Sequence, residues 1–356
     1  MDHLQILKRA WKILWNYRAL WIFGVILALT SASSFGERGN VGPGGDNTWR
    51  RFNFPPSDEI GREIEKLNQL FTRGITAEIQ QVLIWVAVLL VLLFLLLVVL
   101  FTIGRYVSQT ALARMVDQYE RNGEKVTWRQ GFRLGWSRAA WRLFLINLVI
   151  FLPVILGIIL LLSCAAMPVI LGSLGGREPT LAGIIATIGM AFLIIFLAIL
   201  VGVVLSLIME IIQRVCVLEN RGVLDSIRQG WQIVLKNLKD VILMWLILLG
   251  IKIGYFIALI PVALLVIGGG LLVGGGVGIA LYIILRALSG IAAGWITAAI
   301  IGGTLFLVIL SVPLLFLGGL RETYISSVWT LAYRELSLTA PRISNRPENN
   351  EAAPAP

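Results

Sequence analysis

Long apolar stretches alternate with short polar segments along this chain. The apolar stretches cover residues 19–34, 82–104, 143–163, 181–209, 241–267 and 291–318. Each is near or above the ~20 residues that a helix needs to cross the apolar core of a bilayer. The pattern predicts an all-α fold, a polytopic membrane helix bundle of about six spans.

A polar motif precedes the spans and occurs twice. Residues 120–132 (ERNGEKVTWRQGF) and 219–231 (ENRGVLDSIRQGW) share a Glu, a Gly and the sequence Arg-Gln-Gly-aromatic at matching positions. In each copy the Glu and the Gly predict a turn, and a hydroxyl residue stands where the N-cap of a helix is expected. The predicted turn residues are Glu120, Gly123, Thr127, Glu219, Gly222 and Ser226.

The N-terminus carries a looser third copy. Residues 7–21 (LKRAWKILWNYRALW) predict an amphipathic helix that runs without a break into the first span. Such helices lie in the headgroup region, where Lys and Arg reach phosphates and Trp rings sit at the interface. The candidate interface residues of the three copies are Arg9, Trp11, Lys12, Trp15, Arg129, Arg133, Trp136, Arg228, Trp231 and Lys236.

These copies divide the chain into three units, each an interfacial helix with a helical hairpin. The units are residues 1–122, 123–221 and 222–340, and a disordered tail is expected at 341–356. The first unit contains an outer loop at 35–81, whose Gly-rich start is followed by a predicted helix from Ser57. We expect that helix either to cap the bundle or to dock a partner.

Basic residues gather on one side of the predicted membrane. They flank the spans so that, with six spans, four basic groups and both termini face the cytoplasm. A cleaved signal peptide over the first span is the alternative. The amphipathic segment before that span, which resembles the two internal copies, favours a retained span.

The third unit contains a Gly-rich stretch at 268–290. A seventh span here would move the C-terminal arginines to the other side, so the sequence predicts a re-entrant segment. Gly270, Gly274 and Gly278 recur every fourth residue, which predicts close helix packing. No Gly-Lys-Ser/Thr follows the glycines, so a P-loop is not expected.

Charged residues within spans are the usual functional candidates of a membrane protein. Here they are Lys252, Arg286 and Glu210. Glu210 is expected to pair with Arg214 four residues later. Lys252 is expected to snorkel or to form a local pair. An ion relay is not expected, because the spans contain no second mid-membrane carboxylate at a matching depth.

Composition agrees with a membrane protein and leaves little material for catalysis. The chain is 58% hydrophobic and only 14% charged, against about 25% charged in soluble domains. The net charge of +10 is dispersed at span ends, which favours an anionic membrane surface over nucleic acid. With one histidine, two isolated cysteines and no catalytic motif, we expect no metal, no cofactor and no enzymatic activity.

The run from Arg214 to Asn237 resembles a family of bacterial membrane proteins, the membrane domains of glycerophosphoryl diester phosphodiesterases. The likeness lies in the span exit, the Glu and Gly turn, and the basic, Trp-bearing helix. It implies a multi-pass fold in a bacterial inner membrane. Because the catalytic barrel is absent here, the resemblance implies no phosphodiesterase activity.

Two functions fit these patterns. The first is a non-enzymatic membrane scaffold or accessory subunit that binds anionic lipid, or a membrane complex, through its basic, Trp-bearing helices. The alternative is a transporter of small solutes or lipids, in which internal repeats and broken helices are common. A water-accessible cavity around Lys252 or Arg286 would favour transport, and an exposed apolar flank would favour assembly.

Overall fold

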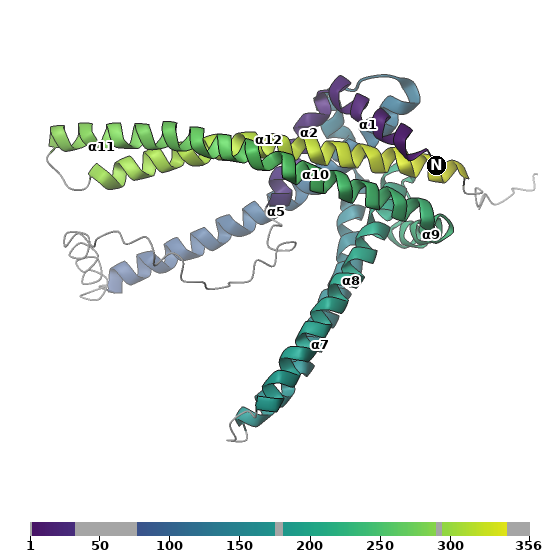
Figure 1. Cartoon of the computed structure of the whole chain (residues 1–356), viewed down its shortest axis with the longest axis horizontal. Coiled ribbons are helices and arrows are strands. Elements are labelled where there is room, and N and C mark those ends of the chain that lie inside the picture. Colours follow the sequence, from purple (N-terminus) through teal and green to yellow (C-terminus); the bar gives the residue numbers. More distant parts are fainter. Residues whose placement is uncertain (1, 33–76, 175–180, 290–293, 340–356) are drawn as a thin grey trace, which may run out of the picture. The chain divides into compact units, whose positions relative to one another are not determined.

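The computed structural model describes residues 2–32, 77–174, 181–289 and 294–339. These residues are almost entirely helical and contain no strand, which confirms the all-α class (Figure 1). The elements are α1 (His3–Asn16), α2 (Ala19–Ala32), α5 (Ala77–Asn122), α6 (Trp128–Gly135), α7 (Arg138–Leu174), α8 (Leu181–Glu219), α9 (Val223–Lys236), α10 (Leu238–Gly270), the π-helical turn η2 (Leu271–Gly275), α11 (Gly276–Ser289) and α12 (Gly294–Thr339).

Within the described residues, five helical stretches are long and apolar enough to cross a membrane. They are Gln81–Asn122, Arg138–Met167, Gly183–Glu219, Leu238–Leu285 and Thr297–Leu338. They overlap the last five predicted spans, so the protein is a multi-pass membrane protein. The first predicted span corresponds to α2, whose 14 residues extend about 21 Å.

The described residues form two units, divided between Leu29 and Thr30 and between Arg105 and Tyr106. The larger unit holds a hydrophobic core that we call the packed domain. It is built from the ends of the long helices together with α1, α6 and α9. Its buried apolar side chains come from residues 6–27, 106–126, 140–146, 208–217, 233–248 and 325–336.

The sequence predicted that the N-terminal helix runs straight into the first apolar stretch, but the structure shows a bend between them. The chain bends by 101° between α1 and α2. Tyr17 lies at the bend and is only 2% exposed. Its hydroxyl donates a 2.6 Å hydrogen bond to the carbonyl oxygen of Val126. This contact with a distant segment stabilises the bend, and the sequence around Tyr17 does not reveal it.

The Gly-rich stretch predicted as re-entrant does not turn back among its described residues. Residues 268–289 continue the helix of α10 through η2 into α11, which lies alongside α12 (Figure 1). A Cβ atom added to Gly274 would lie 2.8 Å from the carbonyl oxygen of Gly302. The glycines therefore bring two helix backbones close together, which confirms the packing predicted from their spacing.

The predicted outer loop lies almost entirely outside the described residues, as does the predicted tail.

Candidate functional site

Three short helices, α1, α6 and α9, each bury a small residue within the packed domain. Gly131 of α6 and Gly230 of α9 are buried, and Ala10 of α1 is 0% exposed. A Cβ on Gly131 would lie 2.4 Å from the Sδ of Met115 in α5, and one on Gly230 would lie 2.6 Å from Cγ1 of Ile212 in α8. The helix α1 packs in turn against α12. Each helix thus contacts the end of a long apolar helix.

The residue after each small residue is aromatic and exposed. Trp11, Phe132 and Trp231 expose 56%, 45% and 47% of their surface. Four positions further on, a second exposed apolar residue extends the same face of each helix. We call these six residues, of which all but Leu235 are aromatic, the aromatic ridges: Trp11, Trp15, Phe132, Trp136, Trp231 and Leu235.

Basic side chains flank the aromatic ridges. The predicted interface residues Arg9, Lys12, Arg129, Arg133, Arg228 and Lys236 are all exposed. Arg9 lies 3.3 Å from a carboxylate oxygen of Glu120, and the guanidinium of Arg129 lies 5.2 Å from the ring centre of Trp128. Within the described part of the chain, Arg133, Arg228 and Lys236 form no ion pair. Their charges are available to an anionic partner.

On α7, α10 and α12, a polar residue separates the packed domain from the exposed apolar stretch. On α10, Leu248 is buried, Lys252 follows one turn later, and Ile253 is exposed. On α7, Asn147 follows the buried Ile146 and donates a 2.7 Å hydrogen bond to the hydroxyl of Tyr106. We call the set the boundary residues: Asn147, Lys252 and Arg321.

The two predicted Glu and Gly turns have different geometries. After α5, Gly123 adopts a left-handed φ of 72°, and five residues separate α5 from α6. After α8, the left-handed residue is Asn220, with φ 54°, and Gly222 is the N-cap of α9. Only three residues link α8 to α9.

The predicted N-cap Thr127 is confirmed, but the predicted N-cap Ser226 is wrong. Thr127 precedes α6, and its backbone N–H donates to Oε1 of Gln130 at 3.1 Å. Ser226 lies within α9, where its hydroxyl donates to the carbonyl oxygen of Gly222 at 2.7 Å. Because this turn is shorter, α9 starts earlier and Ser226 lies inside the helix. Its hydroxyl therefore donates to the carbonyl four residues before it instead of capping the helix.

Glu219 joins three elements at its turn. Its carboxylate accepts hydrogen bonds from the hydroxyl of Tyr333 in α12, from Gln229 in α9 and from Arg221. Glu120, the matching residue of the other turn, pairs with the exposed Arg9. The same position therefore stabilises the core in one copy and the surface in the other.

Sequence reasoning missed Arg114 of α5, which binds the other side of the Glu219 turn. Its guanidinium donates to the carbonyl oxygens of Val217 and Leu134, to the hydroxyl of Ser137 and to Oδ1 of Asn220, at 2.7–3.3 Å. Its acceptors lie at least 20 positions away in the sequence. No local pattern could have identified this residue.

The charged residues predicted within spans have different environments. Glu210 and Arg214 form the expected ion pair across one helical turn. Lys252 is half-buried and has no hydrogen bond or ion pair within the described part of the chain. The side chain of Arg286 lies outside the described residues.

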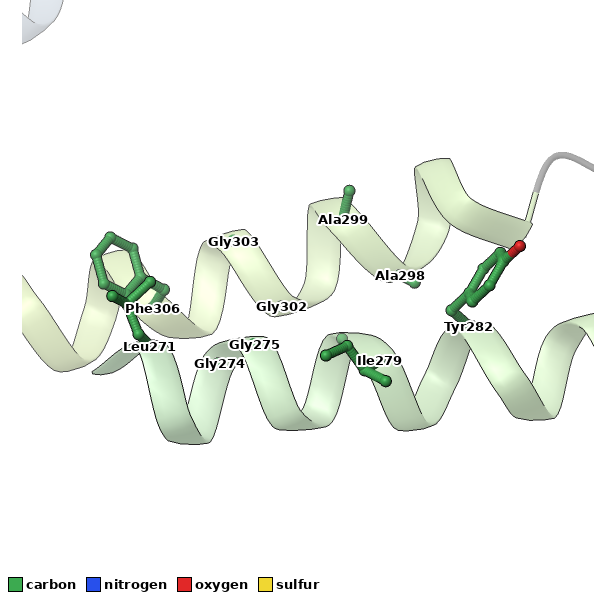
Figure 2. Close-up of a pocket in the computed structure, with 11 residues that line it drawn as sticks. Leu271, Gly274, Gly275, Ile279, Tyr282, Ala298, Ala299, Gly302, Gly303 and Phe306 are labelled. Atoms are coloured by element: carbon green, nitrogen blue, oxygen red, sulfur yellow. The ribbon is translucent and has the colours of Figure 1, made fainter. Parts of the chain in front are cut away.

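Two hollows open on the larger unit. One, of about 280 Å³, is lined by polar side chains that include Arg114, Asp117 and Arg121. The other, of about 460 Å³, is an apolar groove between α11 and α12. Figure 2 shows glycines along this groove, with Tyr282 at one end and Phe306 at the other. Neither hollow is lined by Lys252.

The fold and this surface define a multi-pass membrane protein whose long helices share a packed domain. The chain belongs to a family of unknown function, DUF7544, and the family model matches residues 9–332. That match covers most of the packed domain, four of the five long apolar stretches in full and most of the fifth. No curated protein and no solved structure matches the chain significantly.

Proposed function

We propose that this protein is a non-enzymatic membrane scaffold or accessory subunit that binds an anionic lipid surface through α1, α6 and α9. One observation carries the proposal. In three separate helices a small residue is buried, in two of them against a long helix, while the aromatic residue after it is exposed. The helices thus present their aromatic ridges to the surroundings instead of to the core.

Aromatic ridges are costly in water and favourable at a membrane interface. Burying such apolar area is worth roughly 25 cal/mol per Å², and Trp in particular is enriched where the hydrocarbon meets the headgroups. The boundary residues also support an interface at this part of the protein, because each lies where a long helix changes from a packed surface to an exposed, apolar one. The headgroup layer would then cross the protein at the boundary residues.

The basic residues supply the preference for anionic lipid. Each Lys or Arg near an anionic membrane surface contributes about 1 kcal/mol. Arg129, Arg133, Arg228 and Lys236 are exposed next to the aromatic ridges. Their charge, together with the rule that basic segments remain in the cytoplasm, supports a bacterial inner membrane protein with both termini inside the cell.

Transport receives less support from the geometry. The hollow at the packed domain is lined by Arg114 and Asp117, whose charged groups already have partners. The groove between α11 and α12 is apolar. We therefore propose assembly with lipid, or with another membrane protein, as the function.

The proposal is tested by removing the four basic residues together. We expect Arg129→Gln, Arg133→Gln, Arg228→Gln and Lys236→Gln to weaken the preference for phosphatidylglycerol over phosphatidylcholine. Quenching of Trp fluorescence by brominated lipids in reconstituted vesicles measures that preference. The matched control replaces four basic residues between the first two apolar stretches: Arg38, Arg50, Arg51 and Arg62.

We expect the control to keep the preference of the native protein, although its net charge changes by the same amount. An unchanged preference in the first variant would overturn lipid binding by these helices. Purification from the native membrane in mild detergent then separates the two roles. A protein recovered in stoichiometric amount indicates an accessory subunit, and recovery with anionic lipid alone indicates a lipid-binding scaffold.

A further inference from the structure

Two hydrogen-bond donors without acceptors among the described residues, the Nε of Arg321 and the hydroxyl of Tyr255, belong to side chains in contact where α10 packs against α12. The guanidinium carbon of Arg321 lies 5.6 Å from the ring centre of Tyr255. One nitrogen of Arg321 donates to Glu322 at 2.6 Å, but its Nε is buried and has no partner. Within the described part of the chain, the side chains of Lys252 and Tyr255 have no acceptor either.

Lys252 lies on the same face as Tyr255. It precedes Tyr255 by three residues on α10, which places the two side chains next to each other along the helix. The cluster therefore contains two cations and one hydroxyl, against the single carboxylate of Glu322. Its net charge is positive, and its unused groups are all donors.

The cluster lies where α10 and α12 change from the packed domain to an exposed apolar surface. Lys252 follows Leu248, the last fully buried residue that α10 contributes to the packed domain, by one turn, and Arg321 stands two residues before Thr323, which is 0% exposed. Beyond the cluster, Phe256 on α10 and Val312 on α12 are exposed and apolar. Such a change from packed domain to apolar surface is where a headgroup layer is expected.

A phosphate group matches these donors. It offers several oxygens that accept charge-assisted hydrogen bonds from Lys and Arg, and a further oxygen can accept from a hydroxyl. We propose that Lys252, Tyr255 and Arg321 form a binding site for a phosphate group, supplied by an anionic phospholipid. The site lies on α10 and α12, so it is independent of the lipid surface proposed for α1, α6 and α9.

The experiment counts the lipid that stays with the protein. The full chain is reconstituted in nanodiscs of phosphatidylcholine with a small fraction of phosphatidylglycerol, released into detergent, and weighed by native mass spectrometry. We expect one phosphatidylglycerol to remain bound to the native protein. Each lost charge should weaken binding roughly fivefold, so Lys252→Gln with Arg321→Gln should weaken it about 25-fold.

Two further variants keep the test independent of folding. Lys252→Arg preserves the charge, and we expect it to retain the lipid. Tyr255→Phe preserves the ring beneath Arg321 and removes only the hydroxyl, so we expect a smaller loss of binding. The matched control, Arg138→Gln with Lys239→Gln, removes two exposed basic residues elsewhere and should leave the retained lipid in place.

Inorganic phosphate distinguishes the two sources of the ligand. If excess inorganic phosphate does not displace the lipid, the bound group is a phospholipid headgroup, as proposed. If inorganic phosphate displaces the lipid, the result supports the same phosphate site, with the free ion as its ligand. The site is overturned if the double variant at Lys252 and Arg321 retains as much lipid as the native protein, or if the native protein retains neither ligand. The variant with four substitutions on α6 and α9 should keep this lipid, which separates the two proposals.

Discussion

Gly230 of α9 lies directly against the backbone of Ile212 in α8. A Cβ atom on Gly230 would lie 2.9 Å from the Cα atom and 3.2 Å from the backbone nitrogen of Ile212. A side chain can rotate away from such a contact, but a helix backbone cannot. The absence of a Cβ therefore sets how closely α9 approaches α8, and it leaves Trp231 facing outward.

This contact predicts that a single methyl group at position 230 destabilises the packed domain. We expect Gly230→Ala to lower the free energy of unfolding by about 1–3 kcal/mol, the usual cost of overpacking. Thermal unfolding in detergent measures the change. Gly254→Ala is the control, because nothing lies within 4 Å of a Cβ there; an equal loss in both variants would contradict the account.

The seam between α11 and α12 permits a comparison of neighbouring glycines. A Cβ on Gly302 would lie 2.7 Å from the carbonyl oxygen of Gly274, whereas one on Gly303 would meet nothing within 4 Å. We expect Gly302→Ala to lower the unfolding temperature and Gly303→Ala to leave it nearly unchanged. If both substitutions are tolerated equally, the two helices do not pack through Gly302.

The two turn glutamates should differ in their contribution to stability. Glu219→Ala removes the acceptor of the hydroxyl of Tyr333, a residue that is only 3% exposed. We expect the free energy of unfolding to fall by about 1–3 kcal/mol. Glu120→Ala removes an ion pair with Arg9, whose side chain is 51% exposed, and should cost less than about 1 kcal/mol. Denaturant unfolding of the two variants compares the losses, and equal losses would contradict the different roles of these residues.

Tyr17 should make stability depend on pH in the alkaline range. Burial raises the pKa of Tyr17 from 10.0 to about 12, although its hydrogen bond to Val126 partly opposes the shift. Below pH 10 the phenol is protonated in both the folded and the unfolded protein, so its contribution is fully present. Between pH 10 and 12 only the unfolded protein releases the proton, and about 2.7 kcal/mol of stability should be lost.

Unfolding free energies measured from pH 8 to 12 test this dependence against the variant Tyr17→Phe. We expect the variant to be less stable below pH 10, because the carbonyl of Val126 loses its donor. Its stability should also fall less steeply above pH 10. Parallel curves for the two proteins would show that Tyr17 is not protected from ionisation.

Some of this fold could be predicted from local patterns. The last five predicted spans overlap the long helices, and Gly270, Gly274 and Gly278 contact α12 as their spacing indicated. Both predictions depend on periodicities that a helix imposes on its own residues. The ion pair of Glu210 with Arg214 was predictable for the same reason, since its partners are one turn apart.

Features that depend on distant partners could not be predicted in this way. The bend at Tyr17 depends on Val126, and the role of Arg114 depends on acceptors in α6, α8 and the turns that follow them. The start of α9 also differed, because Asn220 instead of Gly222 takes the left-handed conformation. In each case the residue types were visible in the sequence, but their partners were not.

The central claim is that the outward faces of α1, α6 and α9 lie at the membrane interface. It is tested most directly by the depth of spin labels on cysteines introduced at Trp15, Trp136 and Leu235, in a chain with Cys164→Ser and Cys216→Ala. A fourth label at Leu338, 83% exposed near the end of α12, serves as the aqueous reference. We expect electron paramagnetic resonance to show the first three labels more accessible to oxygen than to a water-soluble nickel complex, and the fourth the reverse. Equal access of the nickel complex to all four labels would contradict the claim.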